Sequence, residues 1–240
     1  MSKGGGGYYR LRLNPGFVAH LFKAMAQQHH RALAPLLKPF IPDDAVVIDV
    51  GAHAGQFTKL FARLAPKGRV YAVEPQSYAR AILRIALRIN RLRNAAVVAL
   101  ALDARPGVAL LHLPVKRSGS YGFGLAHLKA AGETGTGVEE AVGVATLDAL
   151  VAALGLERLD FIKADIEGHE LGLIEGARQT FARFHPALLL EHDRSRLARA
   201  GANLDVLWQT LIGLGYHPYA ANAPRTPLAA PADGDVLWLP

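Results

Sequence analysis

The sequence predicts an α/β fold built on a mostly parallel sheet. Short runs rich in Val and Ile alternate with longer stretches whose apolar residues recur every three to four positions, an alternation typical of βαβ units. Consecutive hydrophobic residues, as in Val46-Val47-Ile48, indicate strands buried on both faces. With 240 residues, 51% of them hydrophobic and 20% charged, the chain is long enough for one well-buried domain and short for two.

The expected elements follow one another in a regular order. A helix with one apolar face should contain Phe17, Leu21 and Met25 and end before the prolines at 35 and 39. Strands are expected at 45–50, 69–74, 96–102, 159–165 and 187–191, and helices at 55–64, 77–89, 168–181 and 204–214. Residues 215–220 and 235–239 should form an antiparallel hairpin at the sheet edge, joined by a loop rich in Pro and Ala.

Residues 107–147 interrupt this alternation. They predict two extra strands, at 108–113 and 141–145, separated by a glycine-rich stretch at 119–137. Long glycine-rich loops in compact folds often cover a binding site, so this one is either a substrate lid or a flexible insertion. We divide the chain into an N-terminal tail and helix, 1–40, that packs on the core, and a single domain, 41–240, that contains the insertion.

Composition excludes several classes of function. The chain has no cysteine, which rules out disulfide scaffolds, thiol nucleophiles and Cys-ligated metals. Residues 1–12 lack the apolar core of a signal peptide, and no apolar stretch approaches the roughly 20 residues of a spanning helix, so we expect a cytoplasmic protein. The net charge of +7 raises the expectation of an anionic partner only slightly, because the cations are scattered through the predicted helices.

The first predicted strand and its turn carry the clearest binding motif. Asp49, Gly51 and Gly55 follow the spacing D-x-G-x-x-x-G, in which a strand ends on a carboxylate and glycine lets the backbone bend beneath a ligand. This differs from the G-x-G-x-x-G of diphosphate sites, so a nucleoside ligand without a diphosphate is favoured, such as S-adenosylmethionine. Glu74 ends the second strand, where a carboxylate accepts both hydroxyls of a ribose.

Two further residues are candidates for cofactor binding. His53 lies in the glycine turn itself, where a residue that tolerates an unusual backbone conformation is the alternative explanation. Asp103 follows the third strand, where the adenine edge should reach, and a cap or turn aspartate explains it equally well.

Acidic residues cluster after the fourth and fifth parallel strands. Asp165 and Glu167 follow one strand and Glu191 ends the next, so all three should converge at one edge of the sheet. Such carboxylates suit either a catalytic proton acceptor or a hard divalent cation such as Mg²⁺, held by Asp165 and Glu191. Lys163 inside the strand should pair with a carboxylate, and His192 is a further candidate base.

Together these stretches resemble the FkbM-type S-adenosylmethionine-dependent methyltransferases. The resemblance spans 46–192 and rests on VIDVGAHAG at 47–55, Glu74-Pro75, Asn94, Thr146-Leu147-Asp148 and above all DFIKADIEGHE at 160–170. His53 stands where many relatives carry asparagine, and Ala164 replaces a larger aliphatic residue. The N-terminal helix and the stretch 119–137 lie outside the resemblance.

The resemblance implies a class I methyltransferase fold, with seven strands in the order 3-2-1-4-5-7-6. It also implies methyl transfer from S-adenosylmethionine to a hydroxyl of a small molecule, sugar or other secondary metabolite. Carried over by position, the cofactor would be held by Asp49, Gly51, Gly55 and Glu74. Asp165 and Glu167 would border the acceptor.

Two other functions stay open. Arg80, Arg84 and Arg88 recur at four-residue spacing on one predicted helix, a basic face suited to RNA or to an anionic membrane surface, although no aromatic stacking platform accompanies it. A non-catalytic nucleotide-binding module would keep the glycine turn and Glu74 without needing the acidic strand ends.

Overall fold

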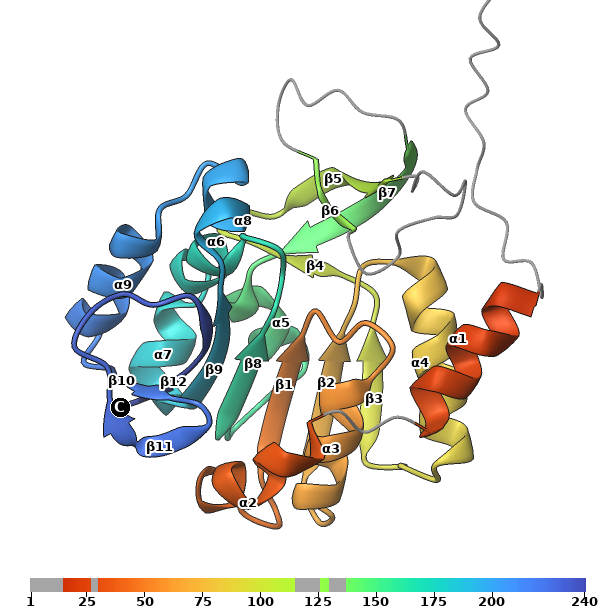
Figure 1. Ribbon diagram of the computed structural model, residues 1–240, viewed down its shortest axis with the longest axis horizontal. Coiled ribbons are helices and arrows are strands. Elements are labelled where there is room, and N and C mark those ends of the chain that lie inside the picture. The colour runs from red at the N-terminus through yellow and green to blue at the C-terminus, as the bar shows by residue number, and fades with distance from the viewer. Residues whose placement is uncertain (1–14, 27–29, 115–125, 130–136) are drawn as a thin grey trace, which may run out of the picture.

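The computed structural model describes residues 15–26, 30–114, 126–129 and 137–240 (Figure 1). Within these residues the main sheet has eight strands, ordered β11-β10-β12-β9-β8-β1-β2-β3. Their bounds are β1 Val46–Val50, β2 Arg69–Val73, β3 Ala95–Val98, β8 Phe161–Ala164, β9 Ala187–His192, β10 His217–Ala220, β11 Ala223–Pro227 and β12 Gly234–Leu239. Leaving out β11, the order is the expected 3-2-1-4-5-7-6, with β12 antiparallel to both β9 and β10.

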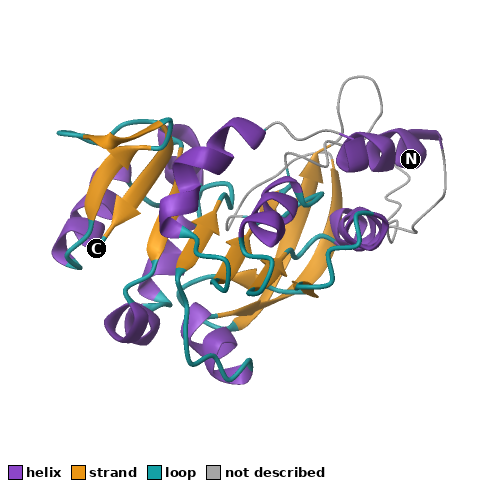
Figure 2. Cartoon of the chain, turned by 90° about the horizontal axis from the view of Figure 1, so that it is seen from below, coloured by secondary structure: helices purple, strands orange, loops and turns teal. Residues whose placement is uncertain are grey.

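Both faces of this sheet are buried, which explains the consecutive hydrophobic residues of the strands. The pleat sends neighbouring side chains to opposite faces, so Val47 and Ile48 join different core clusters, each with no exposed surface. Figure 2 shows helices on both sides of the strands.

Helices in the described part of the chain cover both faces. Their bounds are α2 Ala34–Leu37, α3 Gln56–Leu64 and α4 Ser77–Ile89 on one side, and α5 Leu147–Ala153, α6 Glu170–Glu175, α7 Arg178–Phe184 and α9 Leu204–Gly213 on the other. The single helix expected at 168–181 is wrong, because α6 ends at Glu175 and the Asp148 carboxylate accepts the N–H groups of Gln179 and Thr180 at the start of α7. None of the described helices has the length and apolar composition needed to cross a membrane.

The N-terminal helix α1, Pro15–Ala26, packs on α4. Phe17 lies edge-on to Tyr78 with 5.6 Å between ring centroids, and both side chains are buried. Two short 3₁₀ turns, Arg31–Leu33 and Lys38–Phe40, flank α2 and lead into β1.

The insertion contributes to a separate sheet. Its strands are β4 Ala101–Leu102, β5 Gly107–Pro114, β6 His127–Leu128 and β7 Gly137–Ala145, in the order β4-β7-β5-β6. The strand expected at 96–102 is therefore wrong in its second half, because β4 leaves the main sheet to pair with β7. Most of the glycine-rich stretch 119–137 lies outside the described residues.

A side-chain contact to a helix end helps to hold this second sheet on the main domain. The carboxylate of Glu140 on β7 accepts hydrogen bonds from the backbone N–H and the hydroxyl of Ser77, the first residue of α4. A carboxylate is favourable at this helix end because the first N–H groups have no partner within the helix. The second sheet is thereby held beyond one end of the main sheet (Figure 1).

The chain closes at the far edge of the main sheet. The expected strands at 215–220 and 235–239 are β10 and β12, and they pair antiparallel. The loop expected between them is wrong in part, because Ala223–Pro227 forms the edge strand β11. Its prolines suit an edge, where the missing N–H donors leave no partner unsatisfied.

Candidate active site

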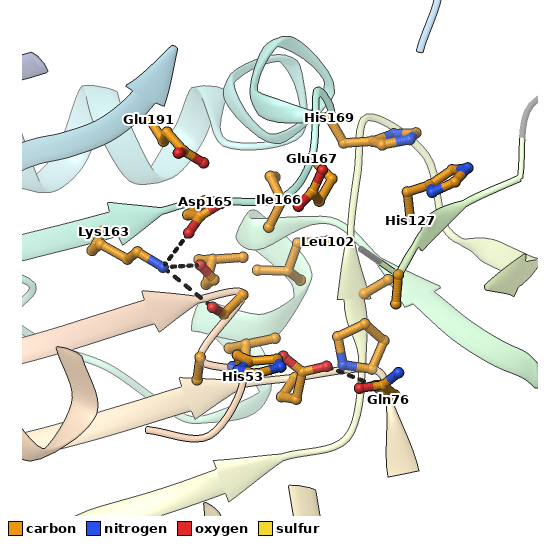
Figure 3. A pocket seen from close by; sticks show the side chains of 18 of the residues that line it. His53, Gln76, Leu102, His127, Lys163, Asp165, Ile166, Glu167, His169 and Glu191 are labelled. Carbon is orange, nitrogen blue, oxygen red and sulfur yellow. Dashed lines mark hydrogen bonds and ion pairs between the residues drawn. The ribbon is translucent and has the colours of Figure 1, made fainter. Parts of the chain in front are cut away.

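A cavity of about 330 Å³ opens at the carboxyl ends of the parallel strands, beneath the second sheet (Figure 3). Six of the residues expected at the site line it: Gly51, His53, Glu74, Asp165, Glu167 and Glu191. Three others, Asp49, Gly55 and Asp103, lie outside its wall. The strands thus bring Glu74, which is expected to bind the ribose hydroxyls, and the acidic cluster into one cavity.

The glycine turn after β1 brings two loops into close contact. Gly51 has a φ of 72°, and a Cβ there would lie 2.0 Å from the carbonyl oxygen of Asp165. His53 also lies in the left-handed region, with a φ of 46°. Gly55 precedes α3 with a φ of 84°, and its Cβ would lie 2.4 Å from a methyl of Leu83. Gly51 therefore allows the loops after β1 and β8 to touch, whereas Gly55 allows α3 and α4 to pack.

Asp49 lies beneath the cavity rather than in its wall. It is fully buried, accepts a hydrogen bond from the Thr58 hydroxyl at 2.5 Å, and has Lys163 Nζ 3.6 Å from its second oxygen. Lys163 Nζ also lies 3.8 Å from Asp165 and donates to the carbonyl of Gly51 at 3.2 Å. Burial alone would lower the pKa of Lys163, but Asp49 and Asp165 raise it, so this side chain stays charged.

Glu74 is held in place by the backbone around it. Its two oxygens accept the N–H groups of His53 at 2.7 Å and Gln76 at 2.8 Å. Burial raises the pKa of Glu74 to about 7, although these two hydrogen bonds favour the charged form. Each oxygen keeps a lone pair for a ligand hydroxyl.

The three expected catalytic carboxylates meet around one arginine. Arg196 lies in α8, Arg194–Arg199, and its guanidinium is 2.7 Å from Glu191, 3.3 Å from Glu167 and 3.8 Å from Asp165. The Asp193 carboxylate caps this helix by accepting the N–H groups of Ser195 and Arg196. The cap fixes the direction from which Arg196 approaches the cluster.

Asp165 and Glu191 influence each other's pKa. Burial and, after it, the neighbouring Asp165 raise the pKa of Glu191 to about 8. Burial also acts to raise the pKa of Asp165, but Lys163 and Arg196 hold it below its ordinary value. Near pH 7 the pair therefore carries one proton, on the side of Glu191, and leaves Asp165 ionised.

Asp103 is engaged with a histidine of the same cavity. Its carboxylate lies 2.9 Å from Nδ1 of His169, which lines the cavity, and accepts the N–H of Ala104 at 2.7 Å. A Cβ on Gly172 of α6 would lie 1.9 Å from this carboxylate, so the glycine makes room for it. The aspartate expected at the adenine edge thus positions His169.

His192, considered as a base, belongs to the core. It is 1% exposed and lies between Trp208 and Trp238, whose indole N–H is 3.4 Å from its Nε2. Burial lowers its pKa to about 4.

The expected family is confirmed by comparison with known proteins. Residues 49–218 match the family described as the methyltransferase FkbM domain. The protein belongs to this family. The matched range leaves out the N-terminal helix, as expected, but runs through the inserted sheet.

Solved structures agree with this FkbM methyltransferase in fold. An FkbM methyltransferase from Methylobacillus flagellatus is 18% identical with a TM-score of 0.53, and the match covers 83% of this chain and 44% of that one. A SAM-dependent methyltransferase from Aquifex aeolicus is 13% identical with a TM-score of 0.50, covering 92% and 96% of the two chains. The class I methyltransferase fold is therefore confirmed.

A curated relative is much longer than this chain. The AMB antimetabolite synthetase AmbE from Pseudomonas aeruginosa is 28% identical, and the match covers 67% of this chain and 9% of the synthetase. The FkbM methyltransferase thus corresponds to a small part of that protein.

The Mg²⁺ expected between Asp165 and Glu191 finds no support in the described part of the FkbM methyltransferase. No group of three or more His, Asp or Glu side chains there is arranged to hold a metal ion. The two carboxylates instead face the cations Lys163 and Arg196.

Four residues of the cavity region were not expected from the sequence. Asp235 on β12 lines the cavity opposite Glu191 in the strand register, and burial raises its pKa. Arg196, His169 and Gln76 are the others. The density of ionisable residues at 191–196 was a usable signal for Arg196, whereas Asp235 and Gln76 carry no local motif.

Proposed function

We propose that this FkbM methyltransferase transfers a methyl group from S-adenosylmethionine to a hydroxyl of a small molecule. One observation carries the proposal: one cavity joins the glycine turn and Glu74 to the carboxylates of Asp165 and Glu191. Such a space has to align an acceptor oxygen with an electrophilic methyl group and exclude water, and positioning supplies most of the rate.

The donor fits the residues present. Glu74 offers hydrogen-bond acceptors to the two ribose hydroxyls, and Gly51, which has no side chain, lines the same cavity. His53 lines the cavity beside them. When bound, S-adenosylmethionine supplies a methyl group on a positively charged sulfur.

The carboxylate pair is suited to take the acceptor's proton. A C–O bond forms as the C–S bond breaks, the bonding pair stays on sulfur, and the hydroxyl proton has to leave. Asp165 is ionised near pH 7 and lines the cavity, so it receives this proton, and Glu191, whose pKa is raised to about 8, adds a second acceptor once it has lost its own proton. Arg196 and Lys163 keep both side chains in place.

A small-molecule acceptor is supported by the curated relative. AmbE is named as the synthetase of an antimetabolite. The match covers 9% of AmbE, so this supports the class of acceptor and not its identity.

The substitution Asp165→Ala tests the proposal. It should abolish turnover and leave the affinity for S-adenosylhomocysteine within about threefold of wild type, because Asp165 acts on the acceptor. Calorimetry with S-adenosylhomocysteine and a discontinuous methyl-transfer assay measure the two quantities. Normal turnover by Asp165→Ala would remove this residue from the chemistry.

The basic helix face is the alternative, for RNA or an anionic membrane surface. Arg80 donates to the carbonyls of Glu74 and Pro75, which draws it toward the end of β2. Arg84 and Arg88 line a groove of about 600 Å³ with two further arginines and several aliphatic side chains, and the described lining contains no aromatic ring for base stacking. Failure to shift mixed RNA in a mobility assay at low salt would end the RNA alternative. Vesicle co-sedimentation tests the membrane one.

A further inference from the structure

Gln76 presents an unused hydrogen-bonding group to the cavity. The side chain is 1% exposed and lines the cavity (Figure 3), and neither its Nε2 nor its Oε1 has a hydrogen-bond partner among the described residues. Buried amides are nearly always paired, because leaving one unpaired forfeits its hydration. A ligand with a donor and an acceptor side by side would satisfy both atoms.

The local structure explains why the protein itself does not satisfy this carboxamide. Gln76 precedes the first residue of α4, but its side chain makes no capping hydrogen bond there. Glu140 caps this helix end instead, through the N–H and hydroxyl of Ser77. The backbone N–H of Gln76 donates to the carboxylate of Glu74. This hydrogen bond holds Gln76 beside the carboxylate that is expected to bind the ribose.

Asp103, which was expected to bind the edge of the adenine, is engaged in other hydrogen bonds. The Asp103 carboxylate is bound to His169 and to the N–H of Ala104, and it does not line the cavity. Gln76 does line it, together with Pro75 and Leu102, whose apolar surfaces suit the faces of a flat ring.

We propose that Gln76 recognises the nucleobase of the methyl donor and selects a 6-aminopurine. The inference rests on the proposed function, since it takes S-adenosylmethionine as the donor. Its Oε1 accepts the exocyclic amine while Nε2 donates to the ring nitrogen N7, the pairing that makes glutamine complementary to adenine. On this edge hypoxanthine offers two acceptors, its carbonyl oxygen and N7, so Gln76 Oε1 is left without a donor whichever way the amide is turned.

The test compares S-adenosylhomocysteine with S-inosylhomocysteine by titration calorimetry. Wild type should bind the adenosyl ligand at least tenfold more tightly than the inosyl ligand. Gln76→Leu, which keeps the bulk and removes the amide, should bring the two dissociation constants within about threefold, chiefly by weakening the adenosyl ligand. The matched control Gln209→Leu, at an exposed position of α9, should keep the wild-type ratio.

The outcomes separate this inference from the proposed function. If wild type binds neither ligand, the donor assignment fails and this inference fails with it. If wild type binds the adenosyl ligand but Gln76→Leu keeps its preference, the inference alone is overturned. Gln76→Asn, which retracts the same amide by one methylene, should also lower the ratio, and it replaces Gln76→Leu if the latter does not fold.

Discussion

Replacing Glu74 by Gln tests whether this carboxylate binds the donor's ribose. Burial raises the pKa of Glu74 to about 7, even though the N–H groups of His53 and Gln76 favour the charged form. Only the ionised form offers acceptors to both ribose hydroxyls. Donor affinity should therefore rise with pH up to this value and then level off.

The size of the effect follows from this pKa. If only the ionised form binds, roughly one molecule in ten is competent at pH 6 and about nine in ten at pH 8. Calorimetry with S-adenosylhomocysteine should thus give about tenfold tighter binding at pH 8 than at pH 6, which equals ~1.4 kcal/mol.

Glu74→Gln should bind the ligand more weakly at pH 8 and lose this dependence on pH. The ligand's own amino group titrates equally in both experiments and cancels in the comparison. A wild-type affinity that stays flat between pH 6 and pH 8, or an equal slope in the variant, would refute the role given to Glu74.

Three further predictions follow from the charges of the site and the core. Lys163→Met leaves the buried Asp49 without its counter-charge and should lower the free energy of unfolding in urea by about 3–5 kcal/mol; a loss below about 1 kcal/mol would contradict the pairing. Methyl transfer should rise with pH as Glu191 loses its proton near pH 8, and Glu191→Gln should remove that rise; an unchanged profile would exclude Glu191 from proton transfer. The pKa of His192 is lowered to about 4 from 6.5 by burial, so the folded state binds fewer protons than the unfolded one, and stability should fall by about 3 kcal/mol as pH drops from 6.5 to 4. In His192→Phe, this part of the acid sensitivity should disappear, and its persistence would assign it to other groups.

Much of the fold could be predicted because strand pairing and burial leave periodic marks in the sequence. The proximity of Asp165 and Glu191 could be predicted, because the carboxyl ends of neighbouring parallel strands lie at one edge of the sheet. The second sheet was harder to predict. Ala101–Leu102 reads as a continuation of the preceding strand, and only its pairing with β7 shows that the chain has changed sheets.

The direction of individual side chains was the main limit of sequence reasoning. Asp49 ends a predicted strand in a binding motif, yet the pleat turns it to the same face as Val47, beneath α3, where Thr58 reaches it. Asp103 has the position expected for adenine recognition, but the missing side chain of Gly172 lets it sit against α6 and bind His169. Both side-chain directions are decided by contacts with another element of the fold, and no pattern within one segment reveals these contacts.

The charges of the site form an alternating chain that links the core to the acceptor side of the cavity. Buried Asp49 faces Lys163, Lys163 faces Asp165, and Asp165 and Glu191 share Arg196. Each cation faces at least two carboxylates, so removing one of these charges leaves another uncompensated in a partly buried environment, which is costly. The carboxylates are thus held for proton transfer by side chains that also stabilise the sheet, and this is why we expect substitutions at Lys163 to lower stability and turnover together.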